Sequence, residues 1–301
     1  MTARRPTSRR AQRRREAALG YLLVAPALVV FAVFVFYPFA KNFELALYRN
    51  PPFPHLPKRY VGLDQAIDVL TSADFRESVW TTVVFAILSV PAGIFLGLAL
   101  AVAAHRRLRG IGIYRTIFAS TVTSSVAVAS VIFGTLFNPV IGWIPALGFN
   151  PRPPVLENPD WALPAVALVS VWQNIGLSFI IMSAGLQAIP DELLEAAEID
   201  GARPWRRFWR VTVPLMSPTI YFTIVVGSIF AFQAFGQIDL LTPSNQKLLG
   251  TNVLTYYIFS NLRERQDPGT AAVLAIALFA ITLLLTLTQM RLLERRVHYA
   301  A

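Results

Sequence analysis

The chain has 301 residues, of which 55% are hydrophobic and only 15% are charged, and its net charge is +10. A water-soluble domain carries roughly 25% charged residues, so this composition excludes an ordinary soluble protein. The chain has no cysteine, which excludes disulfides, thiolate nucleophiles and thiolate metal sites.

The chain begins with a basic tail over residues 1–18. Seven arginines precede residue 16, and an apolar run follows at once. Nucleic-acid binding is disfavoured because no aromatic residues are interleaved with the arginines, whereas a basic flank that orients a membrane span explains them. The apolar run over 19–39 is about twice as long as the apolar part of a signal peptide and ends without small residues, so we predict an uncleaved first span.

Long windows without charged residues predict the membrane spans. A spanning helix needs about 20 mostly apolar residues to cross about 30 Å of hydrocarbon. Each window is long enough, and none has the polar face of a soluble amphipathic helix. We therefore predict an all-α integral membrane protein with six transmembrane helices near 19–38, 79–104, 113–137, 162–187, 218–239 and 270–290.

Charge differs between the two sides on which the connecting segments fall. One side, with both termini, residues 105–115 and residues 188–217, holds 18 of the 27 Lys and Arg residues and has a net charge of +11. The other side has a net charge of −1. Because basic loops stay in the cytoplasm, we predict cytoplasmic tails at 1–18 and 291–301 around a six-span domain at 19–290.

Two external segments are rich in proline. The first becomes polar after its prolines, and we expect it to be helical from Asp64 to Glu77. The second, residues 138–161, contains six prolines, which stiffen a loop and prevent helix continuation. Both segments are either rigid surfaces for a partner or plain connectors.

The cytoplasmic segment 188–217 predicts two short helices joined by a turn at Gly201, a residue that suits a helix C-terminus. The exposed carboxylate of Glu195 lies beside Ala196 and Ala197, whose small size permits close approach by another protein. The segment is therefore either a docking site for a basic partner surface or an amphipathic loop packed on its own bundle.

Uncharged polar residues within the fourth and fifth spans are candidates for lining a solute path. Asn174 and Ser178 are four residues apart, as are Gln233 and Gln237, so we expect each pair to share one helix face. Amides and hydroxyls exchange hydrogen bonds with a polyol, but such residues also hold membrane helices together. The candidate lining residues are Trp172, Asn174, Ser178, Gln233, Phe235 and Gln237.

Several functional groups are missing. The spans have no ionisable residue near their centres, which argues against a proton-driven carrier. The sequence has no phosphate-binding loop, which argues against ATP binding by this chain. The three histidines have no neighbours at metal-ligand spacing, and we predict no metal site. A self-sufficient secondary carrier remains the alternative function, while an intramembrane enzyme lacks a nucleophile–base pair.

The run from Glu195 to Ala202 reads EAAEIDGA, and Phe208, Val211, Pro214 and Pro218 follow it. This pattern resembles the EAA loop of ABC importer permeases, in particular the carbohydrate type that includes the maltose and glycerol-3-phosphate permeases. Residues 23–39, 133–142 and 184–190 are also similar to that family. One departure is the run Leu241-Thr-Pro-Ser-Asn245, where the family often has Gly-Gly-Pro.

The resemblance implies that the EAA loop is a coupling helix that sits in a cleft of a cytoplasmic ATPase. Carried over to this chain, the coupling residues are Glu195, Ala196, Ala197, Asp200, Gly201 and Pro214. The family's assembly implies a second permease as heterodimer partner, two ATPase subunits that bind ATP and Mg, and an extracytoplasmic solute-binding protein. The chain itself would be a non-catalytic, cofactor-free subunit in the lipid of a prokaryotic cytoplasmic membrane, importing a sugar or a glycerol-phosphate-type solute.

Overall fold

The computed structural model describes residues 9–50, 58–105, 110–242 and 249–294. These residues are almost all helical, as predicted, and within them β1 (Tyr48–Arg49) and β2 (Arg59–Tyr60) form one small antiparallel pair. The longer helices are α1 (Arg9–Phe31), α4 (Ala73–Ala104), α8 (Ala162–Gln187), α12 (Ser217–Phe232) and α15 (Pro268–Glu294). The shorter helices are α2 (Tyr37–Ala46), α3 (Asp64–Thr71), α5 (Ile111–Ser120), α6 (Val126–Phe137), α7 (Trp143–Ala146), α9 (Asp191–Ile199), α10 (Pro204–Arg207), α11 (Val213–Leu215), α13 (Gly236–Leu241) and α14 (Leu254–Phe259). Five short turns complete the chain: π turns η1 (Ala32–Phe36), η4 (Phe208–Thr212) and η5 (Ser260–Glu264), and 3-10 turns η2 (Thr121–Thr123) and η3 (Val155–Glu157).

Four continuous helices in the described chain are long and apolar enough to cross a membrane: Glu16–Ala46, Ala73–Ala104, Ala162–Gln187 and Pro268–Leu292. Two bent helix pairs, one around Ser124 and one around Met216, bring the number to six if each pair is one span. The fold is thus the predicted all-α membrane bundle, but two of its spans are not the straight helices that the sequence suggested.

The third span, predicted as one helix over 113–137, bends by 102° between η2 and α6. Ser124 and Ser125 have ψ angles of 127° and 154°, outside the helical region. The Ser125 hydroxyl then accepts a hydrogen bond from the Val128 amide at 3.2 Å and caps α6. The prediction of a straight helix was wrong because serine side chains compete with the helix for backbone groups, which hydropathy does not register.

The fifth span, predicted over 218–239, ends as a helix at Phe232, and α13 begins only at Gly236. The Thr255 hydroxyl of α14 donates to the Ala234 carbonyl, one of the groups that a continuing helix would use. Gln233 and Gln237 therefore lie on opposite sides of a break. The expectation that they share one helix face was wrong.

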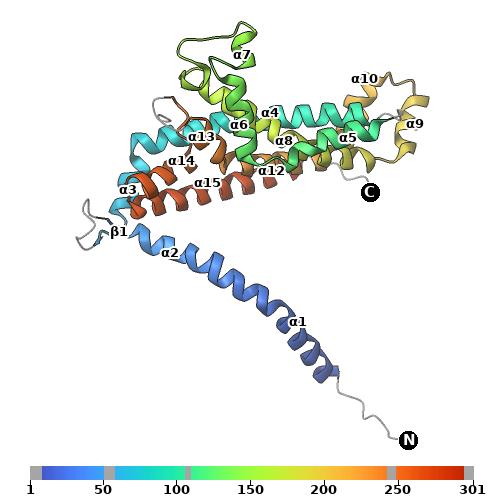
Figure 1. The fold of residues 1–301 in the computed structure, drawn as a ribbon. Helices are drawn as coiled ribbons and strands as arrows, with labels where there is room; N and C mark the ends of the chain where they lie inside the picture. Colours follow the sequence, from blue (N-terminus) through green and yellow to red (C-terminus); the bar gives the residue numbers. More distant parts are fainter. Residues whose placement is uncertain (1–8, 51–57, 106–109, 243–248, 295–301) are drawn as a thin grey trace, which may run out of the picture.

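The helices α4 and α8 pack along their length in the centre of the bundle, and α12 packs against α4. Buried Phe85, Val166 and Ile238 belong to one core cluster that joins α4, α8 and α13. Figure 1 places α9 and α10 at one end of this bundle, near the end of α15, and β1 and α3 at the other end. The two ends correspond to the two sides that the charge distribution separates.

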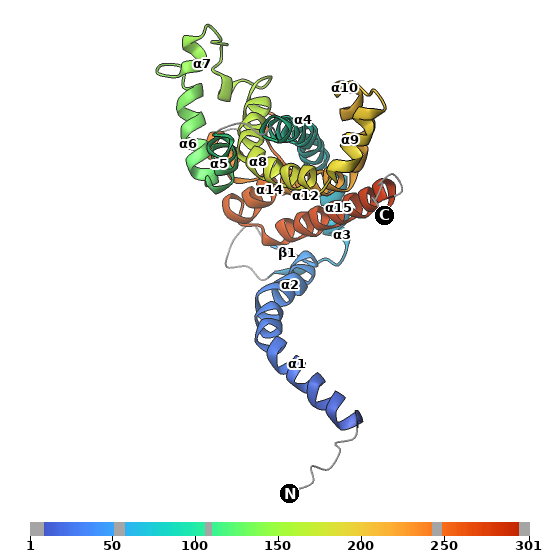
Figure 2. The ribbon, with the colours of Figure 1, turned by 90° about the vertical axis from the view of Figure 1, so that its right-hand side faces the viewer.

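The first span stands apart from the rest of the described chain. Figures 1 and 2 show α1 projecting away from the bundle, while α2 contacts α15 through Phe39 and Phe279, whose ring centroids are 5.2 Å apart. None of the apolar window within Glu16–Ala46 is buried by the described residues. Such a surface requires lipid or another apolar chain around it.

The external segment from Asp64 to Glu77 is helical as predicted, because it forms α3 and the first turn of α4. The Ser72 hydroxyl caps α4 by accepting a hydrogen bond from the Phe75 amide at 3.2 Å. Several predicted features lie outside the described residues: tail residues 1–8 and 295–301, and positions 243–245 of the run that departs from the family pattern.

Candidate functional site

The two short helices predicted within residues 188–217 are present as α9 and α10. Gly201 follows α9 with φ +74°, a left-handed conformation that favours glycine. The Ala202 amide donates to the Ala197 carbonyl and the Gly201 amide donates to the Glu198 carbonyl, both at 3.0 Å. These two bonds form a Schellman motif, which stops α9 and directs the chain into α10.

The coupling candidates form an accessible surface at the α9 end of the molecule. Glu195, Ala196, Asp200 and Gly201 are exposed, and Ala197 is half-buried. Within the described chain, Glu195 has no ion pair, unlike Glu198, whose Oε2 lies 2.7 Å from Arg207 Nη1. The surface therefore offers a free carboxylate next to small side chains.

The segment after α10 connects this surface to the fifth span through η4 and α11. Pro214 lies in α11, and a bend of 66° separates this stretch from α12. Met216, at the bend, is fully buried and belongs to the same hydrophobic cluster as Met182 of α8. Leu194 of α9 packs against this cluster. Leu194 thus packs α9 against a cluster that joins α8 to the start of α12.

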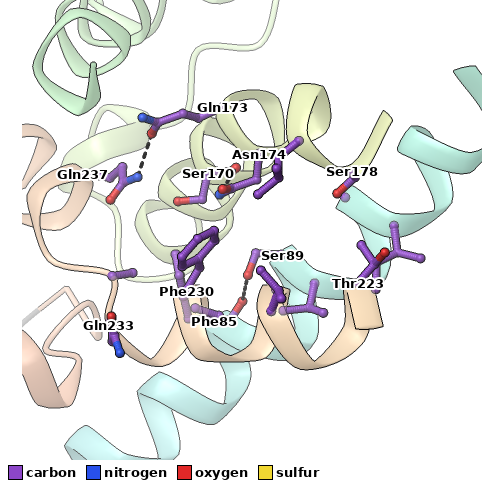
Figure 3. Close-up of a pocket in the computed structure, with 18 of the residues that line it drawn as sticks. Phe85, Ser89, Ser170, Gln173, Asn174, Ser178, Thr223, Phe230, Gln233 and Gln237 are labelled. Carbon is purple, nitrogen blue, oxygen red and sulfur yellow. Dashed lines mark hydrogen bonds between the residues drawn. The ribbon is translucent and has the colours of Figure 1, made fainter. Parts of the chain in front are cut away.

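A cavity of about 370 Å³ lies among α4, α8, α12 and α13 (Figure 3). Five of the six candidate path residues line it: Asn174, Ser178, Gln233, Phe235 and Gln237. Its described lining is uncharged and combines amides, hydroxyls and aromatic rings. Such a cavity provides hydrogen-bonding groups for a hydroxylated solute but no counter-ion for a charge.

The sixth candidate, Trp172, does not line the cavity. Its ring packs edge-on against Phe133 in the core, with centroids 5.4 Å apart. Phe235 lines the cavity at the break between α12 and α13, and it packs against Phe259 with ring centroids 4.9 Å apart. The sequence placed both aromatic residues in the right region, but their orientations depend on tertiary packing.

Gln173, which was not among the candidates, connects three elements at the cavity wall. It accepts a hydrogen bond from Gln237 Nε2 at 2.8 Å and donates through Nε2 to the Ser124 carbonyl at 3.1 Å (Figure 3 shows the first). This chain of bonds joins α13, α8 and the bend of the third span. Its neighbour Asn174 donates to the Ser170 carbonyl at 2.8 Å, which leaves the Asn174 carbonyl oxygen for a solute.

Phe235 packs against Tyr256, which is itself held by a hydrogen bond. Tyr256, whose ring stacks on Phe235 at 6.3 Å, donates from its hydroxyl to Glu264 at 3.2 Å. Burial and the nearby Glu264 carboxylate raise the pKa of Tyr256 to about 12. The hydroxyl therefore stays protonated near neutral pH and remains a donor.

Comparison with known proteins assigns the family. Residues 89–299 match the model of the binding-protein-dependent transport system inner membrane component. The chain belongs to this family. It is therefore a multi-pass inner-membrane permease component of a binding-protein-dependent ABC importer.

Two relatives extend the match beyond that region. The permease is 36% identical over 286 residues to the sn-glycerol-3-phosphate transport system permease protein UgpA of Rhizobium meliloti, covering 93% of this chain and 96% of that protein. It is 32% identical to the UgpA protein of Escherichia coli O157:H7, with the same coverage.

A solved structure shows the same fold. The crystal structure of a bacterial ABC transporter involved in the import of the acidic polysaccharide alginate contains a chain that superimposes with a TM-score of 0.81. The match covers 96% of this permease and 99% of that chain at 20% identity, so it supports the fold and not the solute.

Proposed function

We propose that this permease forms one half of a pore that imports a glycerol-phosphate-type solute by alternating access, without covalent chemistry of its own. In this proposal a second, similar permease completes the pore as a heterodimer. Two cytoplasmic ATPase subunits bind ATP and Mg and act on α9, and an external solute-binding protein delivers the solute. Both termini lie in the cytoplasm with α9.

The geometry of α9 supports the coupling role. Glu195 and the small residues beside it are exposed at the end of the molecule, and Leu194 on the same helix packs into the Met182–Met216 cluster. A partner that binds the exposed surface would thus move α8 and α12 together. These two helices carry half of the residues that line the cavity.

The single observation that carries the solute proposal is the cavity between α4, α8 and α12, because its amide and hydroxyl lining matches the hydroxyls of a polyol. Sequence similarity over nearly the full length to two sn-glycerol-3-phosphate permeases favours a glycerol phosphate over a sugar. Since this half of the pore offers no cation at the cavity, we expect the second permease to provide the counter-charge for the phosphate.

Uptake by the reconstituted importer tests the proposal. Proteoliposomes containing the permease with its partner subunits should accumulate radiolabelled glycerol 3-phosphate when ATP is inside and solute-binding protein is outside. Excess unlabelled glycerol 3-phosphate should abolish the signal, whereas maltose should not. Uptake that proceeds without ATP in response to an ion gradient would contradict the proposal and would favour the secondary carrier.

A further inference from the structure

A second cavity, of about 760 Å³, lies at the end of the bundle opposite α9. It is lined by residues of β1, α3, the end of α14, η5 and the start of α15, and Figure 1 shows β1 and α3 at that end. It shares no lining residue with the cavity between α4 and α12. Unlike that cavity, its lining carries formal charges.

The charges that line this external cavity are not balanced. Three cations, Arg49, Lys58 and Arg265, face two carboxylates, Asp68 and Asp267. Arg49 Nη2 pairs with Asp68 Oδ2 at 2.5 Å, which neutralises one cation. Lys58 and Arg265 have no ion pair within the described part of the chain.

The second carboxylate, Asp267, is occupied by hydrogen bonds to Thr270. Asp267 accepts hydrogen bonds from the Thr270 amide at 3.2 Å and from the Thr270 hydroxyl at 2.7 Å, and so caps α15. Arg265 is held by other contacts: its Cζ lies 5.7 Å from the centre of the Tyr257 ring, and Nη1 is 3.4 Å from Asn261 Oδ1. Its remaining N–H groups are available to an anion.

A buried amide lines the same cavity without a partner. Gln65 is 1% exposed, and neither Nε2 nor Oε1 has a hydrogen bond among the described residues. Its Nε2 lies against the first turn of α15, where a methyl group added at Gly269 would be 2.7 Å away. Buried amides almost always have partners, and this one requires both an acceptor and a donor.

We propose that this external cavity binds a phosphate ester that also carries hydroxyl groups. Arg265 and Lys58 bind the phosphate oxygens, since guanidinium and ammonium groups are the usual partners of phosphate. The Gln65 Nε2 group donates to an oxygen of the ester, and Gln65 Oε1 accepts from one of its hydroxyls. The proposal rests on the proposed function only for the identity of the ester. The ester is either a free solute before it enters the pore or the headgroup of a phospholipid.

Equilibrium binding to the purified permease, together with its partner subunits in phosphatidylcholine nanodiscs, tests this site. Glycerol 3-phosphate should bind more tightly than either glycerol or inorganic phosphate, because only the ester has both groups. Arg265→Gln should weaken that binding about tenfold or more, as expected for loss of a charge-assisted hydrogen bond. Gln65→Leu should weaken it as well, and glycerol should then no longer compete.

The matched control is Arg263→Gln, which removes an exposed cation from the same turn but not from the cavity lining. It should leave binding unchanged. Because Arg265 is itself exposed, Arg265→Gln leaves the fold intact even if Gln65→Leu does not. Equal effects of Arg263→Gln and Arg265→Gln, or no measurable binding of any phosphate compound, would overturn the site.

Nanodiscs that contain phosphatidylglycerol distinguish the two sources. If the headgroup is the ligand, phosphatidylglycerol should displace glycerol 3-phosphate, and Arg265→Gln should abolish the displacement. If the free solute is the ligand, the lipid should have no effect. Binding of phosphate esters that depends on Arg265 without uptake of glycerol 3-phosphate would keep the site and reject only the proposed solute.

Discussion

At the scale of single residues, the cavity between α4, α8 and α12 depends on polar contacts that sequence spacing does not reveal. Asn174 and Ser178 could be predicted as lining residues because α8 is a continuous helix. Gln173 could not, since its role arises from Gln237 and Ser124, which reach it only after two spans have bent. The break between α12 and α13 separates Gln233, which is exposed, from Gln237, which is buried.

We expect Gln237→Leu to destabilise the permease and to reduce uptake. The substitution removes the donor to Gln173 Oε1 and leaves that half-buried acceptor without its partner, which costs at most about 1–3 kcal/mol. Thermal unfolding in detergent would measure the loss. Gln233→Leu is the matched control, because Gln233 lines the same cavity but is exposed, and it should leave the unfolding temperature unchanged.

At the scale of elements, hydropathy predicted which segments are helical but not where the helices break. The breaks at Ser124–Ser125 and Gln233–Phe235 lie in apolar sequence, and each depends on a hydroxyl that takes over a backbone hydrogen bond. The turn at Gly201, in contrast, could be predicted because glycine readily adopts the left-handed conformation that ends many helices. Local chemistry was therefore predictable, and long-range contacts were not.

We expect Gly201→Ala to strain the end of α9. An L-residue with a side chain in the left-handed region costs about 1–2 kcal/mol, and relief of that strain would break the Schellman bonds and shift the coupling surface. Gly250→Ala is the matched control, because Gly250 has φ +62° and equally open surroundings but lies between α13 and α14, away from α9. Both variants should lose similar thermal stability, while only Gly201→Ala should lower uptake; equal uptake would argue against a coupling role for this turn.

At the scale of the whole molecule, the permease has an uncharged cavity in the middle, a charged cavity at one end and an exposed helix pair at the other. The described chain buries almost none of its first span, which is consistent with a subunit that needs lipid or a second permease around it. In the proposed function, a separate cytoplasmic ATPase moves this pore half through α9. The position of α9, packed against the cluster that joins α8 and α12, gives that claim its mechanical basis.

The most direct test is the number of ATP molecules hydrolysed per solute imported by proteoliposomes that contain Glu195→Lys. The variant replaces the free carboxylate of α9 with a cation, so the account predicts loss of uptake while the protein remains inserted and ATP is still hydrolysed. Glu157→Lys makes the same charge change in the external loop and should keep the wild-type ratio. Wild-type uptake and an unchanged ratio in Glu195→Lys would contradict the claim that force enters through α9.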